Sequence, residues 1–262
     1  MSEPVSRRLE LLHGIGRFSI NDILPLVFDD FIELKGDRCF GDDPAMLGGI
    51  GLLGETPVTI IAQIRGRDIE ELQRVNFSMP HPEGYRKAQR LAKQAEKFRR
   101  PVICFIDTPG AYCGAGAEKR GQGQAIARCL LEFMFLETPV ISVILGEGGS
   151  GGALAVGVCD ELAMMENALY SVINPRGFAS ILWKDPSREK EAAELMKITA
   201  EDTAAFGICD YIIKEADDAA GNAAGIKAYL SAALSRLSVL ENLPERRREK
   251  FRRIGIYREE QA

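Results

Sequence analysis

The sequence predicts an α/β fold in which buried strands alternate with helices. Two apolar runs rich in β-branched residues, 101–108 and 139–145, have the length and composition of fully buried strands. Helical segments stand before and after them, and each run is followed by a loop of small residues, 109–117 and 146–152 respectively. Ligands of parallel α/β sheets bind at the carboxyl ends of the strands. If these strands are parallel neighbours, we expect the two loops to meet.

The remaining elements follow from hydrophobic periodicity and from the positions of turn residues. Pro25 is expected in the first turn of the second helix, and a hairpin turn at 54–56 joins the first two strands. Irregular chain is expected at 66–82. The expected helices are 3–13, 20–35, 83–98, 118–136, 153–158, 179–183, 187–197, 199–206, 217–240 and 244–253. The expected strands are 45–53, 57–65, 101–108, 139–145, 161–165, 169–173 and 209–214.

Length and composition are those of an ordinary globular protein. With 262 residues, 46% hydrophobic and 27% charged, the chain suits a single domain, 1–262, with an N-terminal helical segment, 1–35, and C-terminal helices, 216–262. A net charge of −5 provides no basic field for nucleic acid. The sequence contains neither a secretion signal nor a run long enough to span a membrane, so we expect a cytoplasmic protein.

The loop 146–152 contains five glycines in seven residues and stands between an expected strand and an expected helix. Glycine permits positive φ and lets a ligand approach the backbone closely, and the first turn of a helix offers N–H donors. This combination predicts a site for an anion or an oxyanion. The alternative is a turn that serves only tight packing. The loop matches neither a P-loop nor a dinucleotide-binding turn.

Residues suited to acid–base or nucleophilic catalysis are scarce. Of the two histidines, His13 is expected on the surface of a helix, and His81, between two prolines, in a structural role. Ser150 lacks an evident histidine partner, and Asp37 with Arg38 is expected to form an ion pair that braces a turn. The pattern therefore favours stabilisation of an oxyanion by backbone amides, while the proton moves between substrates.

The six cysteines are scattered along the chain and form no CxxC pair. This spacing argues against a zinc site, and we expect reduced thiols and no metal bound by this chain. The cysteines are at positions 39, 104, 113, 129, 159 and 209.

Five ordered segments together resemble the carboxyltransferase α subunit of bacterial-type acetyl-CoA carboxylase, over about residues 20–215. They read GDRCFGDDPAMLGGIG, NFSMPHPEGYRKA, FIDTPGAYCGAGAEKRGQ, GEGGSGGALAVG and SVINPRGFASILWK. The resemblance implies the crotonase (ClpP-like) spiral fold of repeated ββα units. It also implies transfer of a carboxyl group from carboxybiotin, carried on a separate protein, to acetyl-CoA. The product is malonyl-CoA, in the first step of fatty acid synthesis.

The same resemblance implies partners and site residues. The partners are a β subunit of zinc-ribbon type in an α2β2 assembly, a biotin carboxyl carrier protein and biotin carboxylase. Biotin serves as its own base, and backbone amides of the two small-residue loops hold its ureido oxygen. The matching positions are Gly114, Ala115, Gly116, Gly151, Gly152 and Ala153. Residues expected to bind biotin beside them are Tyr112, Gly148, Gly149 and Ser150.

Three positions depart from the family pattern. Cys113 replaces a proline, Arg176 a glutamate and Phe178 a cysteine. These changes leave the acyl-CoA substrate open, and two alternatives remain. One is a component of a related biotin-dependent acyl-CoA carboxylase or decarboxylase. The other is a non-catalytic scaffold of crotonase fold, against which the exposed amides of the glycine loop argue.

Two surfaces have more than one interpretation. The apolar helical face 126–135 suits either a subunit interface or the core of the protein. The basic segment 246–253 suits either a solvated helix or the docking of an acidic partner such as the biotin carrier.

Overall fold

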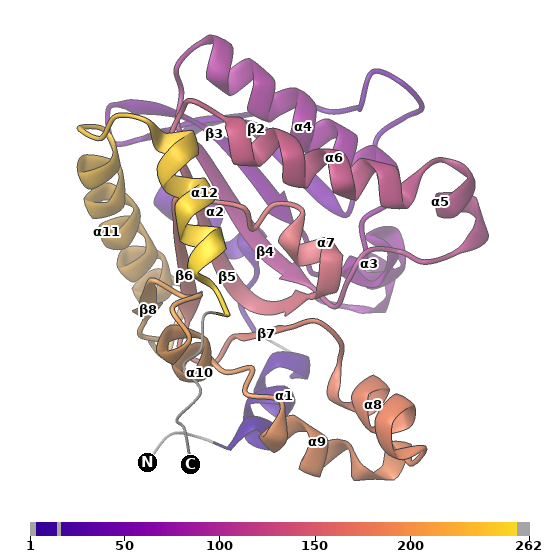
Figure 1. The fold of residues 1–262 in the computed structure, drawn as a ribbon. Coiled ribbons are helices and arrows are strands. Elements are labelled where there is room, and N and C mark those ends of the chain that lie inside the picture. The colour runs from indigo at the N-terminus through magenta and orange to yellow at the C-terminus, as the bar shows by residue number, and fades with distance from the viewer. Residues whose placement is uncertain (1–3, 15–16, 256–262) are drawn as a thin grey trace.

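The described part of the chain is built on one mixed sheet of eight strands. Its central strands, β4 and β5, run through the middle of Figure 1. The structure, a computed structural model, describes residues 4–14 and 17–255, apart from the side chain of His13. The strand order is β1-β2-β3-β4-β5-β6-β8, with β7 beside β5. The strands are β1 Asp29–Glu33, β2 Met46–Leu53, β3 Thr56–Gln63, β4 Val102–Thr108, β5 Val140–Gly149, β6 Glu161–Met165, β7 Leu169–Ser171 and β8 Tyr211–Ile213.

Helices cover both faces of the sheet, and the helices α1, α8 and α9 lie beyond one end of it. Figure 1 shows α4, α6 and α12 along one face, whereas α2 and α11, which pack on each other, lie behind and beside the sheet. The helices are α1 Val5–His13, α2 Ile20–Val27, α3 Ile69–Arg74, η1 Asn76–Ser78, α4 Pro82–Lys97, α5 Ala115–Lys119, α6 Gln122–Phe135, α7 Ser150–Leu154, α8 Pro175–Phe178, η2 Ala179–Trp183, η3 Pro186–Arg188, α9 Glu189–Leu195, α10 Ala200–Ala205, α11 Ala219–Leu237 and α12 Leu243–Arg253.

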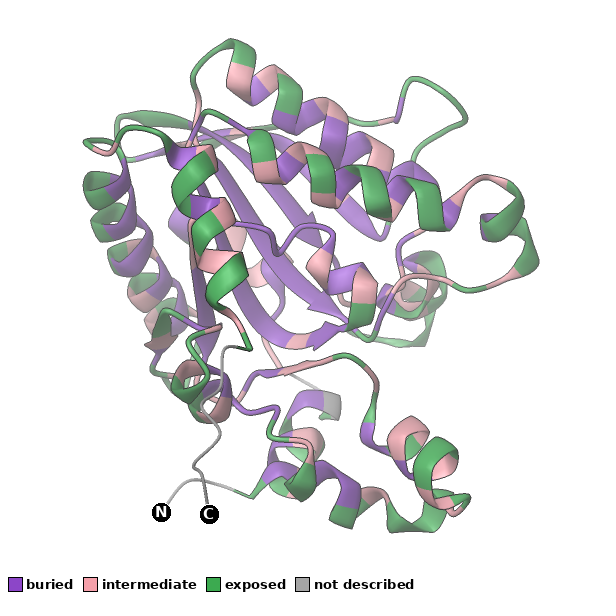
Figure 2. Cartoon of the chain, viewed as in Figure 1, coloured by how far each residue is buried: buried purple, intermediate pink, exposed green. Residues whose placement is uncertain are grey.

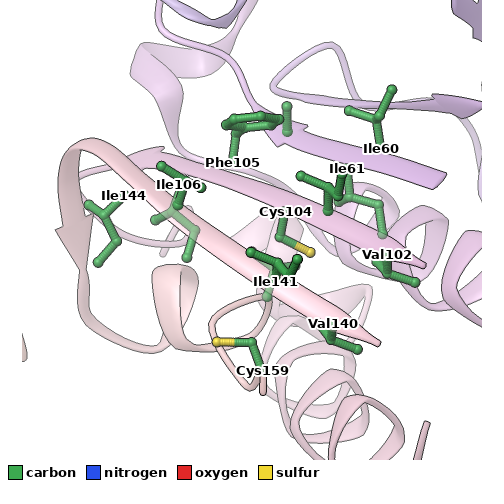
Figure 3. Close-up of a cluster of buried hydrophobic side chains, with 14 of the residues drawn as sticks. Ile60, Ile61, Val102, Cys104, Phe105, Ile106, Val140, Ile141, Ile144 and Cys159 are labelled. Carbon is green, nitrogen blue, oxygen red and sulfur yellow. The ribbon is translucent and has the colours of Figure 1, made fainter. Parts of the chain in front are cut away.

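The core lies at the centre of the sheet, where β4 and β5 are parallel neighbours in register from Val102 opposite Val140. All seven residues of β4 are buried, as Figure 2 shows for the central strands. Strands covered on both faces are apolar along their whole length rather than alternating, which is why these runs were recognisable. Isoleucines, valines, Phe105 and two buried thiols fill this region (Figure 3). The expectation of parallel neighbours is confirmed.

A smaller apolar cluster joins the chain's first helix to α9, below the sheet in Figure 1. It consists of Val5, Leu12, Leu169, Ala193 and Ile198. Leu169 begins β7, so this cluster continues directly from the sheet. The single domain 1–262 stays a prediction.

The helix expected at 20–35 is wrong in its second half. The helix α2 ends at Val27, and Asp29–Glu33 forms β1, the antiparallel edge strand beside β2. Pro25 stands in the interior of α2 rather than in its first turn, where its missing N–H weakens the helix just before it ends. The apolar spacing around Phe31 fits either structure, and pairing with β2 selects the strand.

Other boundaries also differ from the expected ones. The helix expected at 118–136 is two helices, α5 and α6, separated at Gly121, whose φ of +82° breaks the helical path. The region 66–82, expected to be irregular, contains α3 and η1. The helix expected at 153–158 is instead the short α7, 150–154, because β5 continues to Gly149 by pairing with β7.

Candidate active site

The two small-residue loops touch where β4 and β5 end. A Cβ on Gly149 would overlap the carbonyl of Pro109, and a Cβ on Gly152 would overlap the backbone N of Ala111 and stand 2.6 Å from the carbonyl carbon of Gly110. Glycine is therefore required at both positions for the loops to approach so closely. The convergence that the sequence predicted is present, and it is made by 109–111 with 149–152.

The turn from β5 into α7 uses no connecting residue. Gly149 ends the strand and caps the helix, and Ser150 makes the turn with φ 54°, in the left-handed region. For a residue with a side chain this conformation is strained, and such strain is concentrated at functional sites. Ser150 is exposed and Gly151 is half-buried, so this turn is open to a ligand. The sequence predicted special backbone angles at the glycines of this loop, whereas the structure has one at Ser150.

The first turn of α7 has N–H groups to offer. The first N–H groups of a helix have no acceptor within it, and in α7 these belong to Ser150, Gly151 and Gly152. A Cβ on Gly151 would be in ordinary contact, 3.6 Å from Ile126 Cγ2, so the approach to this backbone is not obstructed. Because the pairing of Gly149 with Ser171 on β7 engages the N–H of Ser150, the N–H groups of Gly151 and Gly152 remain for an anionic oxygen.

The first loop is held by side chains at its base. Thr108 Oγ1 donates to the carbonyl of Ser78 at 2.5 Å and accepts from the N–H of Gly110 at 3.1 Å. Further along, Gln122 Nε2 donates to the carbonyl of Tyr112 at 2.9 Å. The Tyr112 ring packs against the His81 ring with centroids 4.6 Å apart. The backbone of this loop is thus fixed by its neighbours.

The other predicted residues of the first loop lie beyond this contact. Gly114 caps α5, and Ala115 and Gly116 begin it. A Cβ on Gly114 would stand 2.5 Å from the Tyr112 ring. Figure 1 shows α5 displaced from α7, so these three residues are not part of the contact between the loops. Their role toward biotin stays a prediction.

A buried charge cluster supports the strand ends beneath the loops. The Asp107 carboxylate accepts from Arg17 and from the N–H of Glu147 at 3.1 Å, and Arg17 also donates to the carbonyl of Leu145 at 3.2 Å. Arg65 lies 3.8 Å from the Glu147 carboxylate, and burial beside Arg17 lowers the pKa of its guanidinium. The N-terminal segment is thereby joined to the ends of both central strands.

Two of the three departures from the family pattern, Arg176 and Phe178, line cavities at this end of the sheet. Arg176 lines a cavity of about 320 Å³ together with Arg65, Asp107 and Glu147. Phe178 packs edge-on against Trp183, at 5.5 Å between ring centroids, and lines a largely apolar cavity of about 770 Å³. The second cavity reaches Ser150 and Gly151, so a change at Phe178 alters the surroundings of the glycine turn.

Asp37 braces a turn, but not through the expected partner. Its carboxylate accepts from the N–H groups of 39–41 and from Arg86 Nε at 2.8 Å, whereas Arg38 donates to the carbonyl of Lys35. Burial by itself would raise the pKa of Asp37, and these hydrogen bonds lower it to about 2. The ion pair with Arg38 was wrong because the arginine that faces this turn comes from α4.

Histidine contributes packing at this end of the molecule. The N–H of His81 donates to Asp43 Oδ2 at 2.8 Å, and its Nδ1 lies 3.3 Å from Arg120. The side chain of His13 lies outside the described residues. Among residues 4–14 and 17–255, no three His, Cys, Asp or Glu side chains are grouped so as to hold a metal ion.

Comparison with known proteins identifies the family. The family described as "Acetyl co-enzyme A carboxylase carboxyltransferase-like" matches residues 6–255. The chain belongs to this carboxyltransferase family. The acetyl-coenzyme A carboxylase carboxyl transferase subunit alpha of Clostridium acetobutylicum is 52% identical over 258 residues, which are 96% of this chain and 94% of that one. The Clostridium tetani protein named as subunits beta/alpha is 53% identical over 244 residues, 90% of this chain and 42% of that one.

Solved structures agree with the fold of a carboxyltransferase. Transcarboxylase 12S, described as a hexamer assembly with methylmalonyl-coenzyme A and methylmalonic acid bound, superposes with a TM-score of 0.73 at 18% identity. The match covers 92% of this chain and 46% of that one. The crotonase fold that the resemblance implied is confirmed.

The basic segment of this carboxyltransferase chain is not uniformly solvated. In α12, Arg247 is 1% exposed, and its guanidinium donates to Asp160 at 2.7 Å and to the carbonyl of Phe133 at 2.5 Å. Lys250 contacts Asp210, and Arg246 is exposed. The apolar face 126–135 is likewise divided: Cys129 and Phe133 are in the core, whereas Leu131 and Phe135 are exposed. Part of each surface is therefore buried. The helix α12 is not a fully solvated helix, and the face 126–135 is neither wholly core nor wholly exposed.

Proposed function

We propose that this chain is the α subunit of an acetyl-CoA carboxylase. It transfers the carboxyl group from carboxybiotin, on a carrier protein, to acetyl-CoA to give malonyl-CoA, the first step of fatty acid synthesis. The observation that carries the proposal is the turn at 150–152, which is open at Ser150 and Gly151 and pressed against the first loop at Gly152, in a chain that belongs to the carboxyltransferase family.

Carboxybiotin supplies the carboxyl group, and this chain supplies the surface that orients it. The N–H groups of Gly151 and Gly152 donate to the ureido oxygen, and fixed donors of this kind favour the charge that develops there. Ala153, the next residue of α7, is buried within the helix that carries these donors. Gly148, Gly149 and Ser150 shape the backbone that biotin approaches. The donors fit the ureido group because they are unpaired within the helix, and the Gly151 residue is only half-buried.

The first loop provides the second wall of the site. Gly114, Ala115 and Gly116 open α5 with further N–H groups, and Tyr112 is the aromatic residue beside them. The proton moves between the substrates, so the chain's task is to hold and orient them and to exclude water.

The proposed partners are a β subunit of zinc-ribbon type in an α2β2 assembly, a biotin carboxyl carrier protein and biotin carboxylase. The Clostridium tetani relative, named as beta/alpha, supports a close association of the two subunits. A cytoplasmic location is proposed with these partners. Within the described part of the chain, no helix has the length and apolarity needed to cross a membrane.

The experiment is a malonyl-CoA assay with the purified chain, its cognate β subunit and carboxybiotin. Acetyl-CoA and longer acyl-CoA thioesters are compared, because Arg176 and Phe178 leave the acyl group open. Turnover of acetyl-CoA supports the proposal. Turnover confined to another acyl-CoA would favour a related carboxylase or decarboxylase, and no turnover with any thioester would favour a scaffold.

A further inference from the structure

The carbonyl of Gly152 is held by side chains from outside its helix. Two neighbouring carbonyls serve the helix itself: Gly151 accepts from Ala155, and Ala153 accepts from Val156. The carbonyl of Gly152 instead accepts from Gln63 Nε2 at 2.8 Å and from the Tyr85 hydroxyl at 3.2 Å. Gln63 ends β3 and Tyr85 lies in α4, so side chains of two separate elements hold one peptide group of α7. We call these two hydrogen bonds to the Gly152 carbonyl the grip.

Both gripping side chains are completely buried, and each is fixed in turn. Gln63 Oε1 accepts from the N–H of Asp107 at 3.3 Å, so one amide group connects the end of β4 to α7. Burial raises the pKa of the Tyr85 phenol well above its usual value, with smaller contributions from Cys129 and Asp43, so it remains a donor. A buried polar group is costly unless it is hydrogen-bonded, and here the bonds converge on one carbonyl.

A helix as short as α7 cannot hold its own orientation. It has five residues, and isolated helices of this length are unstable in water. Its position against the first loop must come from contacts outside it. A Cβ on Gly152 would stand 2.9 Å from the Tyr85 hydroxyl and 2.6 Å from the carbonyl carbon of Gly110. Gly152 therefore lies between the side chain that holds it and the first loop.

We propose that Gln63 and Tyr85 are positioning residues that, by gripping the Gly152 carbonyl, hold the N–H donors of Gly151 and Gly152 at the distance and angle that the transferred group requires. This inference rests on the proposed function. Misplacement of a reacting group by about 1 Å lowers rates by about a hundredfold, so a loosened grip affects the rate of transfer more than the binding of substrates.

The test compares Gln63→Met and Tyr85→Phe with Gln89→Met in the complex with the β subunit. Gln89 is a buried glutamine of α4, one turn after Tyr85, and it donates to the carbonyl of Ala125 at 2.7 Å. Its variant loses a comparable buried bond outside the contact between the loops. We expect Gln63→Met to lower kcat by on the order of tenfold to a hundredfold, and Tyr85→Phe by less, with KM for the carrier changed little. Gln89→Met keeps kcat while losing similar thermal stability.

Amide hydrogen exchange of the peptide that contains 150–154 provides a readout besides activity. We expect faster exchange there in Gln63→Met and Tyr85→Phe and unchanged exchange in Gln89→Met. If all three variants lose kcat in proportion to stability, or if exchange at 150–154 is unaltered, the inference is overturned. If Gln63→Met does not fold, Tyr85→Phe decides, because it removes a single hydroxyl. An inactive wild-type complex would sink the proposed function, while the exchange experiment still tests the grip.

Discussion

Gly152 has a steric requirement rather than a conformational one. Its φ lies outside the left-handed region, but a Cβ would overlap Ala111 N and press on Gly110. We predict that Gly152→Ala displaces α7 from the first loop and lowers malonyl-CoA formation by about a hundredfold. The control is Gly123→Ala in α6, where a Cβ meets nothing within 4 Å. Normal activity of a folded Gly152→Ala variant would remove this contact from the mechanism.

The cysteines divide sharply by exposure. Cys39 and Cys113 are exposed, whereas the other four are buried. Burial raises the pKa of Cys129 to about 12 and that of Cys209 to about 11, so their reactive thiolates are scarce at neutral pH. We predict that a disulfide reagent at pH 8 modifies two thiols rapidly in the native chain and all six after unfolding. Rapid modification of a third thiol would contradict the burial.

At the scale of single residues, the sequence indicated which loops form the candidate site but not which side chains hold those loops in place. The glycines were visible as a composition, because five of them in seven residues is unusual. Ser150 was not, because nothing in a sequence reports the φ of a serine. Gln63 and Tyr85 are 89 and 67 residues away from Gly152, and only the packed sheet brings them to it.

The helix α12 fastens the end of α6 to the sheet. Arg247 donates to the carbonyls of Phe133 and Leu136, which the end of α6 leaves without helical partners, and it pairs with Asp160. We predict that Arg247→Met lowers the free energy of unfolding by about 3–5 kcal/mol, because the buried Asp160 loses its partner. Arg246→Met, at the exposed neighbouring position, should change it by less than about 0.5 kcal/mol in the same denaturant titration. Equal small effects would show that α12 is not fastened in this way.

Because Arg247 is buried, a test of carrier docking has to change only the exposed arginines of α12. A charge reversal that includes Arg247 would unfold the chain's end and mimic a loss of docking. Reversal of exposed residues alone, Arg246, Arg252 and Arg253, isolates the surface charge.

Buried elements were predicted from the sequence more accurately than exposed ones. The central strands were found because strands covered on both faces are apolar throughout. The edge strand β1 was mistaken for helix because its side chains are mostly exposed, so its identity depends on backbone pairing with β2. The basic pattern of α12 concealed one inward arginine, because a side chain's direction depends on the partner that packs against its helix.

The molecule as a whole presents apolar surface next to its glycine turn. Val172 is 80% exposed and Leu195 is 58% exposed, and both line the 770 Å³ cavity that reaches Ser150 and Gly151. Exposed apolar side chains beside a functional turn mark a surface that a partner covers. The family resemblance implied a β subunit, and this surface is where we expect it to bind.

We predict that the chain alone is folded but inactive, and that malonyl-CoA forms only when the β subunit is added. An enzyme that joins two substrates must hold both, because orientation supplies much of the rate, and this chain's paired loops serve one of them. Leu195→Asp should weaken assembly in sedimentation experiments and lower activity in parallel. Leu131→Asp, on α6, is the matched control because Leu131 is 60% exposed and Leu195 is 58% exposed. Stronger loss of assembly in Leu131→Asp would move the interface to α6, and robust turnover by the chain alone, with β excluded by mass spectrometry, would refute the two-subunit site.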